Sequence, residues 1–172
     1  MQRIAIDMDG VLSDTVKQFI SWEERVSGKK ITHEEILGKP ELEVFPNSKK
    51  HLHTKDFFRT TEVIEGSQAI VKQLNEKYDV YIVSAATEFP LSLTEKQEWL
   101  NEYFPFITWQ QMVFCGSKDI IQADIMIDDH FKNLNGFNGK LSILYTQPHN
   151  IYADNGRHTR VHNWQDIERL LL

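Results

Sequence analysis

The sequence has very little cysteine, no long apolar stretch and no excess of basic residues. Its single cysteine, Cys115, cannot form an internal disulfide or supply a cysteine-rich zinc site. No apolar run approaches the ~18 residues of a transmembrane helix, and the first residues lack the apolar stretch and cleavage site of a signal peptide. The 25 acidic and 19 basic residues give a net charge of −6, which argues against binding to nucleic-acid polymers or anionic membranes. We therefore expect a cytoplasmic protein with no membrane and no nucleic-acid partner.

What the sequence does contain is the composition of an ordinary folded domain, with 41% hydrophobic and 26% charged residues. Five short runs are nearly continuous in apolar residues, as strands are when both faces of a sheet are covered. These runs are Arg3–Ile6, Val80–Val83, Met112–Phe114, Ile125–Ile127 and Leu141–Tyr145. Stretches with helical apolar spacing accompany the later runs: Gly66–Lys77, Pro90–Phe104 and Trp164–Leu172. This alternation predicts an α/β fold with a Rossmann-like, parallel, five-stranded sheet.

One interval is too long for a simple crossover. More than 70 residues separate the first two strand patterns, where a crossover unit needs about 30. Asp14–Arg25 has helical apolar spacing, and Thr32–Leu37 begins with the capping-box pair Thr32 and Glu35. We therefore predict that residues 15–65 form a small helical cap, inserted after the first strand. Residues 1–14 and 66–172 would then form the α/β core.

Polar side chains that carry chemistry follow the strand patterns. Because ligands bind beyond the carboxyl ends of parallel strands, we expect these side chains to meet at one edge of the sheet. They are Asp7 and Asp9 after the first strand, Ser84 after the second, Lys118 after the third, and Asp128 with Asp129 after the fourth. Each position alone is ordinary, since a lone aspartate or serine usually caps a helix or a turn. The ordered set as a whole predicts a site.

The chemistry of this set points to phosphoryl transfer. Converging carboxylates without paired cysteines or histidines make a hard oxygen site that suits Mg²⁺. A hydroxyl and a lysine beside the metal suit the oxygens of a phosphoryl group. One carboxylate can attack phosphorus and form an aspartyl-phosphate, and a second carboxylate two residues later can protonate the leaving oxygen and then activate water.

The order of these motifs resembles that of the haloacid dehalogenase-type phosphatases. The chain has D-x-D-G-V-L from Asp7, then a strand ending in Ser84, then Lys118, then I-D-D at 127–129. The insert after the first motif resembles their small helical C1 cap. Further segments resemble the 5′(3′)-deoxyribonucleotidase family in particular: D-M-D-G-V-L-S-D at 7–14, Phe57-Phe58-Arg59, Val63–Gly66, Leu100–Phe106 and Phe114–Gly116.

The resemblance assigns a role to each matching position. It implies that Asp7 is the nucleophile and a magnesium ligand, and that Asp9 is the general acid/base and gives its backbone carbonyl to the metal. Ser84 and Lys118 would bind the phosphate. Asp129 would be the direct metal ligand, with Asp128 behind it. The implied function is a Mg²⁺-dependent phosphomonoesterase that acts on nucleoside monophosphates through an aspartyl-phosphate on Asp7, either as a monomer or as a homodimer.

Three other functions are compatible with parts of the pattern. The first is a phosphatase for a sugar phosphate or another small metabolite. The second is a phospho-receiver or binding module, although a receiver has its acidic pair after the first strand and its phosphorylated aspartate alone after a middle strand. The third is a catalytically idle relative, which the complete set of site residues disfavours.

The predicted cap is rich in aromatic residues that could stack on a nucleobase. We expect Phe19 and Trp22 to form the core of the cap, and Phe57 and Phe58 to line the substrate pocket. Related sequences often have an aromatic residue directly after the first motif, where this chain has Thr15.

The histidines do not predict a zinc site from the sequence. The close pairs are His51 with His53 and His158 with His162, and neither pair has a third ligand nearby or lies in a clear helix. His130 follows the aspartate pair, where we expect it to cap the next helix.

Overall fold

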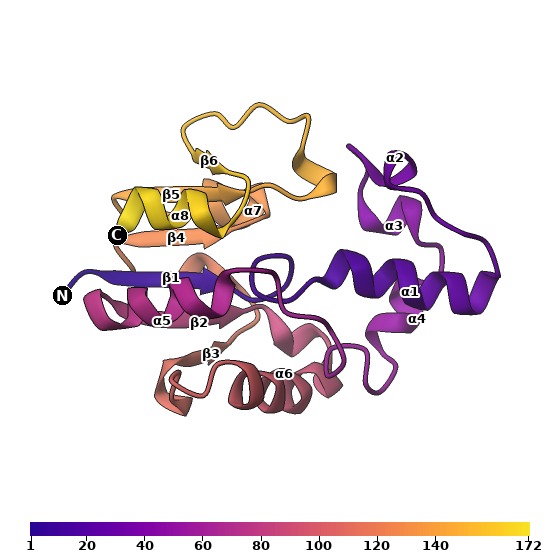
Figure 1. The fold of residues 1–172 in the computed structure, drawn as a ribbon, viewed down its shortest axis with the longest axis horizontal. Coiled ribbons are helices and arrows are strands. Elements are labelled where there is room, and N and C mark those ends of the chain that lie inside the picture. Colours follow the sequence, from indigo (N-terminus) through magenta and orange to yellow (C-terminus); the bar gives the residue numbers. More distant parts are fainter.

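The computed structural model describes residues 1–172 and has an α/β core with a helical lobe at one end of its sheet (Figure 1). All strands of the sheet are parallel, in the order β3-β2-β1-β4-β5-β6. The strands are β1 (Arg3–Asp7), β2 (Asp79–Ser84), β3 (Met112–Phe114), β4 (Ile125–Asp128), β5 (Leu141–Tyr145) and β6 (Thr159–Val161). The α/β class is therefore confirmed.

The predicted number of strands is wrong, because the sheet has six strands rather than five. The additional strand, β6, pairs with β5 at the edge of the sheet. It contains only Thr159, Arg160 and Val161, of which Val161 alone is buried. A single apolar residue in a short edge strand produces no apolar run, so the sequence pattern did not reveal it.

Helices cover the two faces of the sheet unequally. Ile4 and Ile6 of β1 point to the face covered by the longer helices, within a core cluster of 22 buried residues. Those helices are α5 (Ser67–Lys77), α6 (Pro90–Tyr103) and α8 (Trp164–Leu171). Ala5 points to the opposite face, where the short helix α7 (Phe131–Asn135) contributes Leu134 to a cluster of seven. This alternation along β1 is what a strand covered on both faces requires.

The helical lobe contains α1 (Thr15–Ser27), α2 (His33–Ile36), α3 (Glu41–Val44) and α4 (Ser48–Leu52). The side chain of Asp14 caps α1 by accepting a hydrogen bond from the Lys17 backbone N–H. Gly28 ends this helix with φ +70°, a conformation that favours glycine. The lobe has its own buried core, made of Phe19, Ile36, Phe45, Phe57 and Phe58.

The chain enters and leaves this lobe through two adjacent segments. The backbone N–H of Asp14 donates to the carbonyl of Glu62, and that of Ile64 donates to the carbonyl of Leu12, each at 2.8 Å. Because these contacts close the insert at its base, we propose that residues 15–65 are the cap. None of the helices combines the length and hydropathy needed to cross a membrane.

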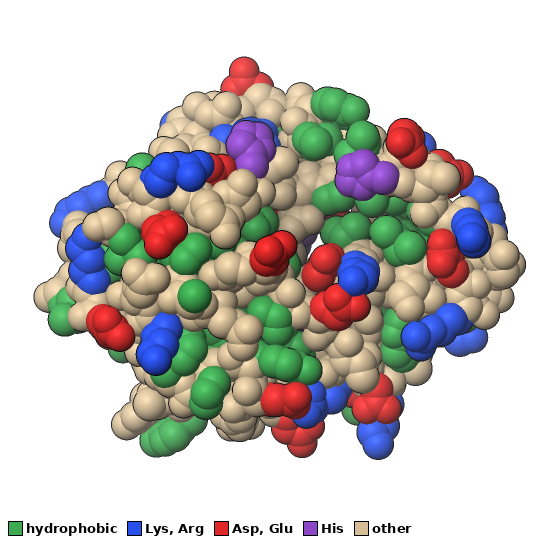
Figure 2. All heavy atoms as spheres, in the orientation of Figure 1, with side chains coloured by type: hydrophobic (Ala, Val, Ile, Leu, Met, Phe, Trp, Pro, Cys, Tyr) green, Lys and Arg blue, Asp and Glu red, His purple; other side chains and the backbone are tan.

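Four short 3₁₀ turns lie in the connections. Three of them follow strands, namely η1 (Ala86–Glu88), η3 (Lys118–Ile120) and η4 (Pro148–Asn150), and η2 (Trp109–Gln111) lies between α6 and β3. On the face shown in Figure 2, acidic and basic side chains are interspersed and the surface is hollowed between core and cap.

Candidate active site

The loop after β1 places two carboxylates at the end of the sheet. The chain turns sharply after Asp7, and the carbonyl of Met8 accepts hydrogen bonds from the backbone N–H groups of Leu12 (2.8 Å) and Ser13 (3.0 Å). Gly10 has φ +73°, and a Cβ added there would lie 2.5 Å from Oδ2 of Asp129. Glycine is therefore required at this position both for the turn and for the close approach of the β1 and β4 loops.

A buried lysine joins the predicted residues of three strands. Nζ of Lys118 lies 2.6 Å from Oδ1 of Asp7 and 2.6 Å from Oδ2 of Asp128, and only 2% of its side chain is exposed. Burial by itself lowers the pKa of Lys118, but the two carboxylates raise it overall, so the ammonium stays charged. Asp128 also accepts hydrogen bonds from the backbone N–H of His130 and the side chain of Asn133, so its oxygens are fully engaged within the protein.

Asp7 and Asp129 have the features of ligands for a hard cation. Carboxylate oxygens of Asp7, Asp128 and Asp129 lie within 4.8 Å of one another. Oδ1 of Asp129 is buried without a hydrogen-bond partner, as is Oδ1 of Asp9. Burial raises the pKa values of Asp7 and Asp129. Lys118 only partly offsets this rise at Asp7, and His149 with Lys118 only partly offsets it at Asp129. A divalent cation would satisfy the unpaired oxygen and favour the ionised carboxylates, so the residues present fit such an ion.

Lys96 of α6 is a site residue that sequence reasoning missed. Its Nζ donates to Oδ2 of Asp9 (2.5 Å) and to Oγ of Ser84 (2.9 Å), and it lies 4.5 Å from the centre of the Phe58 ring. The hydroxyl of Ser84 is buried, accepts this hydrogen bond from Lys96 and itself donates to Oδ2 of Asp9 at 3.5 Å. A signal was present, because Ser92, Lys96 and Trp99 follow the spacing of the buried helix face. A lysine within an apolar stripe is a candidate for function.

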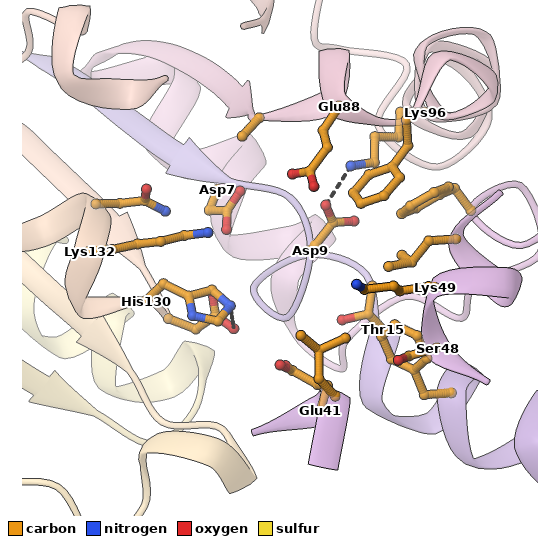
Figure 3. Close-up of a pocket in the computed structure, with 18 of the residues that line it drawn as sticks. Asp7, Asp9, Thr15, Glu41, Ser48, Lys49, Glu88, Lys96, His130 and Lys132 are labelled. Carbon is orange, nitrogen blue, oxygen red and sulfur yellow. Dashed lines mark hydrogen bonds and ion pairs between the residues drawn. The ribbon is translucent and has the colours of Figure 1, made fainter. Parts of the chain in front are cut away.

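A cavity of about 530 Å³ lies between core and cap, and Asp7 and Asp9 line it (Figure 3). This volume is within the range of small-molecule sites. Figure 3 shows Asp9 and Lys96 beside Thr15, Ser48 and Lys49 of the cap. The cavity also contacts Phe19, Leu52, His53, Phe58 and Phe89.

The two adjacent phenylalanines have different surroundings. Phe58 lines the cavity, whereas Phe57 is completely buried and packs on Phe19, Trp22 and Phe58 within the cap. The expectation that both rings line the pocket is therefore corrected for Phe57, because its ring fills the core of the cap.

The buried carboxylate of Glu95, next to Lys96, fixes the segment that carries Phe58. It accepts hydrogen bonds from the backbone N–H groups of Asp56 (2.7 Å), Phe58 (3.0 Å) and Arg59 (3.1 Å). Asp56 is the only non-glycine residue with positive φ, at 71°. Two consecutive residues of α6 therefore position the site, because Glu95 binds the backbone of Phe58 and Lys96 binds Asp9.

Comparison with known proteins agrees with this arrangement. A sequence model of the 5′ nucleotidase, deoxy (pyrimidine), cytosolic type C family matches residues 1–172. The 5′(3′)-deoxyribonucleotidase of Bacillus subtilis is 44% identical over 172 residues, covering 98% of each chain, and that of Bacillus phage SPbeta matches equally well.

The chain belongs to the 5′(3′)-deoxyribonucleotidase family. The predicted resemblance is thereby confirmed, and this deoxyribonucleotidase-family chain is a phosphoric monoester hydrolase.

Solved structures show the same fold at much lower identity. A haloacid dehalogenase-like hydrolase from Streptococcus pneumoniae has a TM-score of 0.65 and 12% identity, covering 100% of this chain and 99% of its own. A haloacid dehalogenase-like protein from Agrobacterium tumefaciens has a TM-score of 0.65 and 15% identity, covering 99% and 97%.

Proposed function

We propose that this deoxyribonucleotidase-family enzyme hydrolyses pyrimidine deoxynucleoside monophosphates, with Mg²⁺ and an aspartyl-phosphate on Asp7. One observation carries the proposal. The Asp7–Lys118 ion pair and Asp9 line the same cavity as Phe58, whose ring centre lies 4.5 Å from Nζ of Lys96, the lysine that binds Asp9. The charged groups of Asp7, Lys118 and Asp9 suit a phosphate ester, and the ring of Phe58 suits a planar base. The relatives named above are deoxyribonucleotidases, which supports this choice of substrate.

Each of the charged residues at this site has a distinct role. An oxygen of Asp7 attacks phosphorus as the bond from phosphorus to the nucleoside oxygen breaks, and Lys118 compensates the charge on the phosphoryl oxygens. Asp9 gives a proton to the leaving oxygen and later removes one from the water that hydrolyses the aspartyl-phosphate. Lys96 holds the Asp9 carboxylate in place by a hydrogen bond and also donates to the hydroxyl of Ser84.

Mg²⁺ would be held by Asp7, Asp129 and the backbone carbonyl of Asp9, and it supplies positive charge to the phosphoryl oxygens. The buried, unpaired Oδ1 of Asp129 supports this assignment. A HAD-hydrolase with a similar fold, from Bacillus subtilis, was solved bound to magnesium (TM-score 0.61, 13% identity, 99% and 98% coverage).

Without Mg²⁺, stability is expected to fall as the pH rises. Burial raises the pKa of Asp7 and Asp129 above the ordinary value of 3.8, so the folded protein keeps protons that the unfolded chain releases. The free energy of unfolding then decreases as the pH rises from about 4, where these carboxyls lose protons in the unfolded chain, to about 8, where they lose them in the folded protein. Mg²⁺ binds the ionised carboxylates and should raise the thermal midpoint more at about pH 7.5 than at about pH 5. Equal increments at both pH values, measured against EDTA, would contradict a cation at these carboxylates.

The role of Phe58 in binding the base is tested by a matched pair of variants. Phe58→Ala removes a ring that lines the cavity and should raise KM for a pyrimidine deoxynucleotide roughly tenfold, with little effect on nitrophenyl phosphate. Phe57→Ala removes a buried ring from the cap core, so it should lower the thermal midpoint by more. A Phe58→Ala variant that loses both substrates equally would show that the ring is structural.

The experiment that tests the function is a phosphate-release panel of deoxy- and ribonucleoside monophosphates and sugar phosphates. We expect the highest kcat/KM for pyrimidine deoxynucleotides and loss of activity in EDTA that Mg²⁺ restores. A higher kcat/KM for a sugar phosphate would replace the nucleotide proposal with a metabolite phosphatase. Full activity in excess EDTA would refute the magnesium site.

A further inference from the structure

The connection between β5 and β6 begins with a turn beside the loops that follow β1 and β4. This turn consists of Gln147 and η4, and it follows β5 at the edge of the sheet where all the parallel strands end. β5 pairs with β4, so the turn lies next to the loop that carries Asp129. None of the residues of the turn has a role in the chemistry proposed above.

The carboxylate of Asp129 is not held by hydrogen bonds of its own. Its Oδ1 is buried without a partner. The ring nitrogens of His149 and His130 lie 3.8 and 3.9 Å from its Oδ2, beyond hydrogen-bonding distance. The neighbouring Asp128 differs, because its carboxylate accepts hydrogen bonds from the side chain of Asn133 and the backbone of His130. The direction of the Asp129 carboxylate is therefore set by its backbone.

Asn150 binds that backbone with a buried amide. Its Nδ2 donates to the carbonyl of Asp129 at 2.8 Å and to the carbonyl of Tyr145 at 2.9 Å. Its Oδ1 accepts hydrogen bonds from the backbone N–H of Gln147 at 3.2 Å and from the guanidinium of Arg160 at 3.1 Å. All four hydrogen-bonding positions of the amide are thus used, and only 1% of the residue is exposed. The amide therefore has one orientation, which fixes the carbonyl of Asp129.

The same turn binds the loop after β1. Nε2 of Gln147 donates to the carbonyl oxygen of Gly10 at 2.5 Å. Gly10 directly follows Asp9, whose backbone carbonyl is a proposed magnesium ligand. The loops of Gly10 and Asp129 come so close that a Cβ added at Gly10 would lie 2.5 Å from Oδ2 of Asp129. The turn therefore binds the backbone of both loops near the place where they meet.

His149 adds a second contact to the loop after β4. Its Nε2 donates to the same carbonyl oxygen of Asp129, at 3.0 Å. A carbonyl oxygen has two lone pairs, and here both are used by consecutive residues of one turn, His149 and Asn150. The other ring nitrogen of His149 lies 3.4 Å from Oε1 of Glu41 in the cap. The turn thus contacts the cap as well as the two loops.

We propose that Gln147 and Asn150 are positioning residues for the magnesium site and act on its ligands through the backbone of Gly10 and Asp129. This inference rests on the proposed function, because it takes Asp129 and the carbonyl of Asp9 as ligands. Contacts that orient metal ligands usually contribute about 10- to 100-fold to metal affinity. Mg²⁺ requires near-ideal octahedral geometry at about 2.0–2.1 Å, whereas Ca²⁺ accepts looser geometry. Loss of these contacts should therefore weaken Mg²⁺ binding more than Ca²⁺ binding.

The test measures Mg²⁺ and Ca²⁺ binding by calorimetry, with the full chain, without substrate and at a temperature where each variant is folded. Asn150→Ala removes both donors and should weaken Mg²⁺ binding about tenfold or more, and Ca²⁺ binding by less. Gln147→Met keeps the length of the side chain without its donor and should weaken Mg²⁺ binding several-fold. The matched control is Asn155→Ala, because Asn155 lies in the same connection but donates to the carbonyl of His158. It should bind Mg²⁺ as the unaltered protein does.

A purely structural role would lower the thermal midpoint in EDTA and leave the Mg²⁺ affinity of the folded protein unchanged. That result in Asn150→Ala would overturn the proposal. If Asn150→Ala does not fold, unchanged Mg²⁺ affinity in Gln147→Met would overturn it.

Asp129→Asn separates this inference from the proposed function. The change alters a ligand directly, so it should weaken Mg²⁺ binding more than either variant of the turn. Unchanged Mg²⁺ binding in Asp129→Asn would overturn the magnesium site itself. Weakened binding in Asp129→Asn with unchanged binding in Asn150→Ala and Gln147→Met would overturn only the positioning role.

Discussion

Asp7→Asn is expected to abolish phosphate release while the protein stays folded. An amide cannot attack phosphorus and is a poor ligand for Mg²⁺, so the loss should reach at least about three orders of magnitude in kcat. The fold should survive because Lys118 keeps its second carboxylate partner, Asp128, at 2.6 Å. The measurement is kcat on a pyrimidine deoxynucleotide, with the thermal midpoint recorded for the same sample.

The matched control for this variant is Asp119→Asn. Asp119 is an exposed carboxylate next to Lys118 in sequence, and the same change there should leave kcat unaltered. Activity of Asp7→Asn within tenfold of the unaltered enzyme would contradict the covalent mechanism.

Asp9→Asn should produce the second-largest loss, and its size should depend on the leaving group. Without a proton donor, a nucleoside leaves as a strongly basic alkoxide, so kcat for a nucleotide should fall about 10²- to 10⁴-fold. Nitrophenolate needs no proton, and formation of the aspartyl-phosphate from nitrophenyl phosphate should fall much less. The amide keeps an oxygen that can accept the hydrogen bond from Lys96, so the position of the side chain is preserved. Equal losses in that bond-breaking step for both substrates would show that Asp9 is not the general acid.

The fold and the charged residues at the strand ends could be predicted from the sequence for one physical reason. Parallel strands end at one edge, so residues that directly follow strands must meet there, as Asp7, Lys118 and Asp128 do. The parallel sheet was predicted from the nearly continuous apolar runs. β6 was missed because its residues include only one buried apolar side chain.

The remaining site residues depend mainly on tertiary contacts, and only Lys96 left a signal in the helical spacing of its neighbours. Lys96 acts from the middle of a helix, where a charge is ordinarily assumed to face water. Phe57 and Phe58 are adjacent and chemically identical, and only tertiary packing decides which of them lines the cavity. Glu41 and His149 meet because the cap folds back over the core, and their distance along the chain conceals that contact.

Phosphoryl transfer to Asp7 can be observed directly in Asp9→Asn with nitrophenyl phosphate. This variant should form the aspartyl-phosphate, because the leaving group needs no acid, and should hydrolyse it slowly, because the general base is missing. We expect a burst of one nitrophenolate per chain and one phosphoryl group, which mass spectrometry should map to Asp7. A burst with the phosphoryl group on another residue, or steady turnover with no phosphorylated protein, would contradict it.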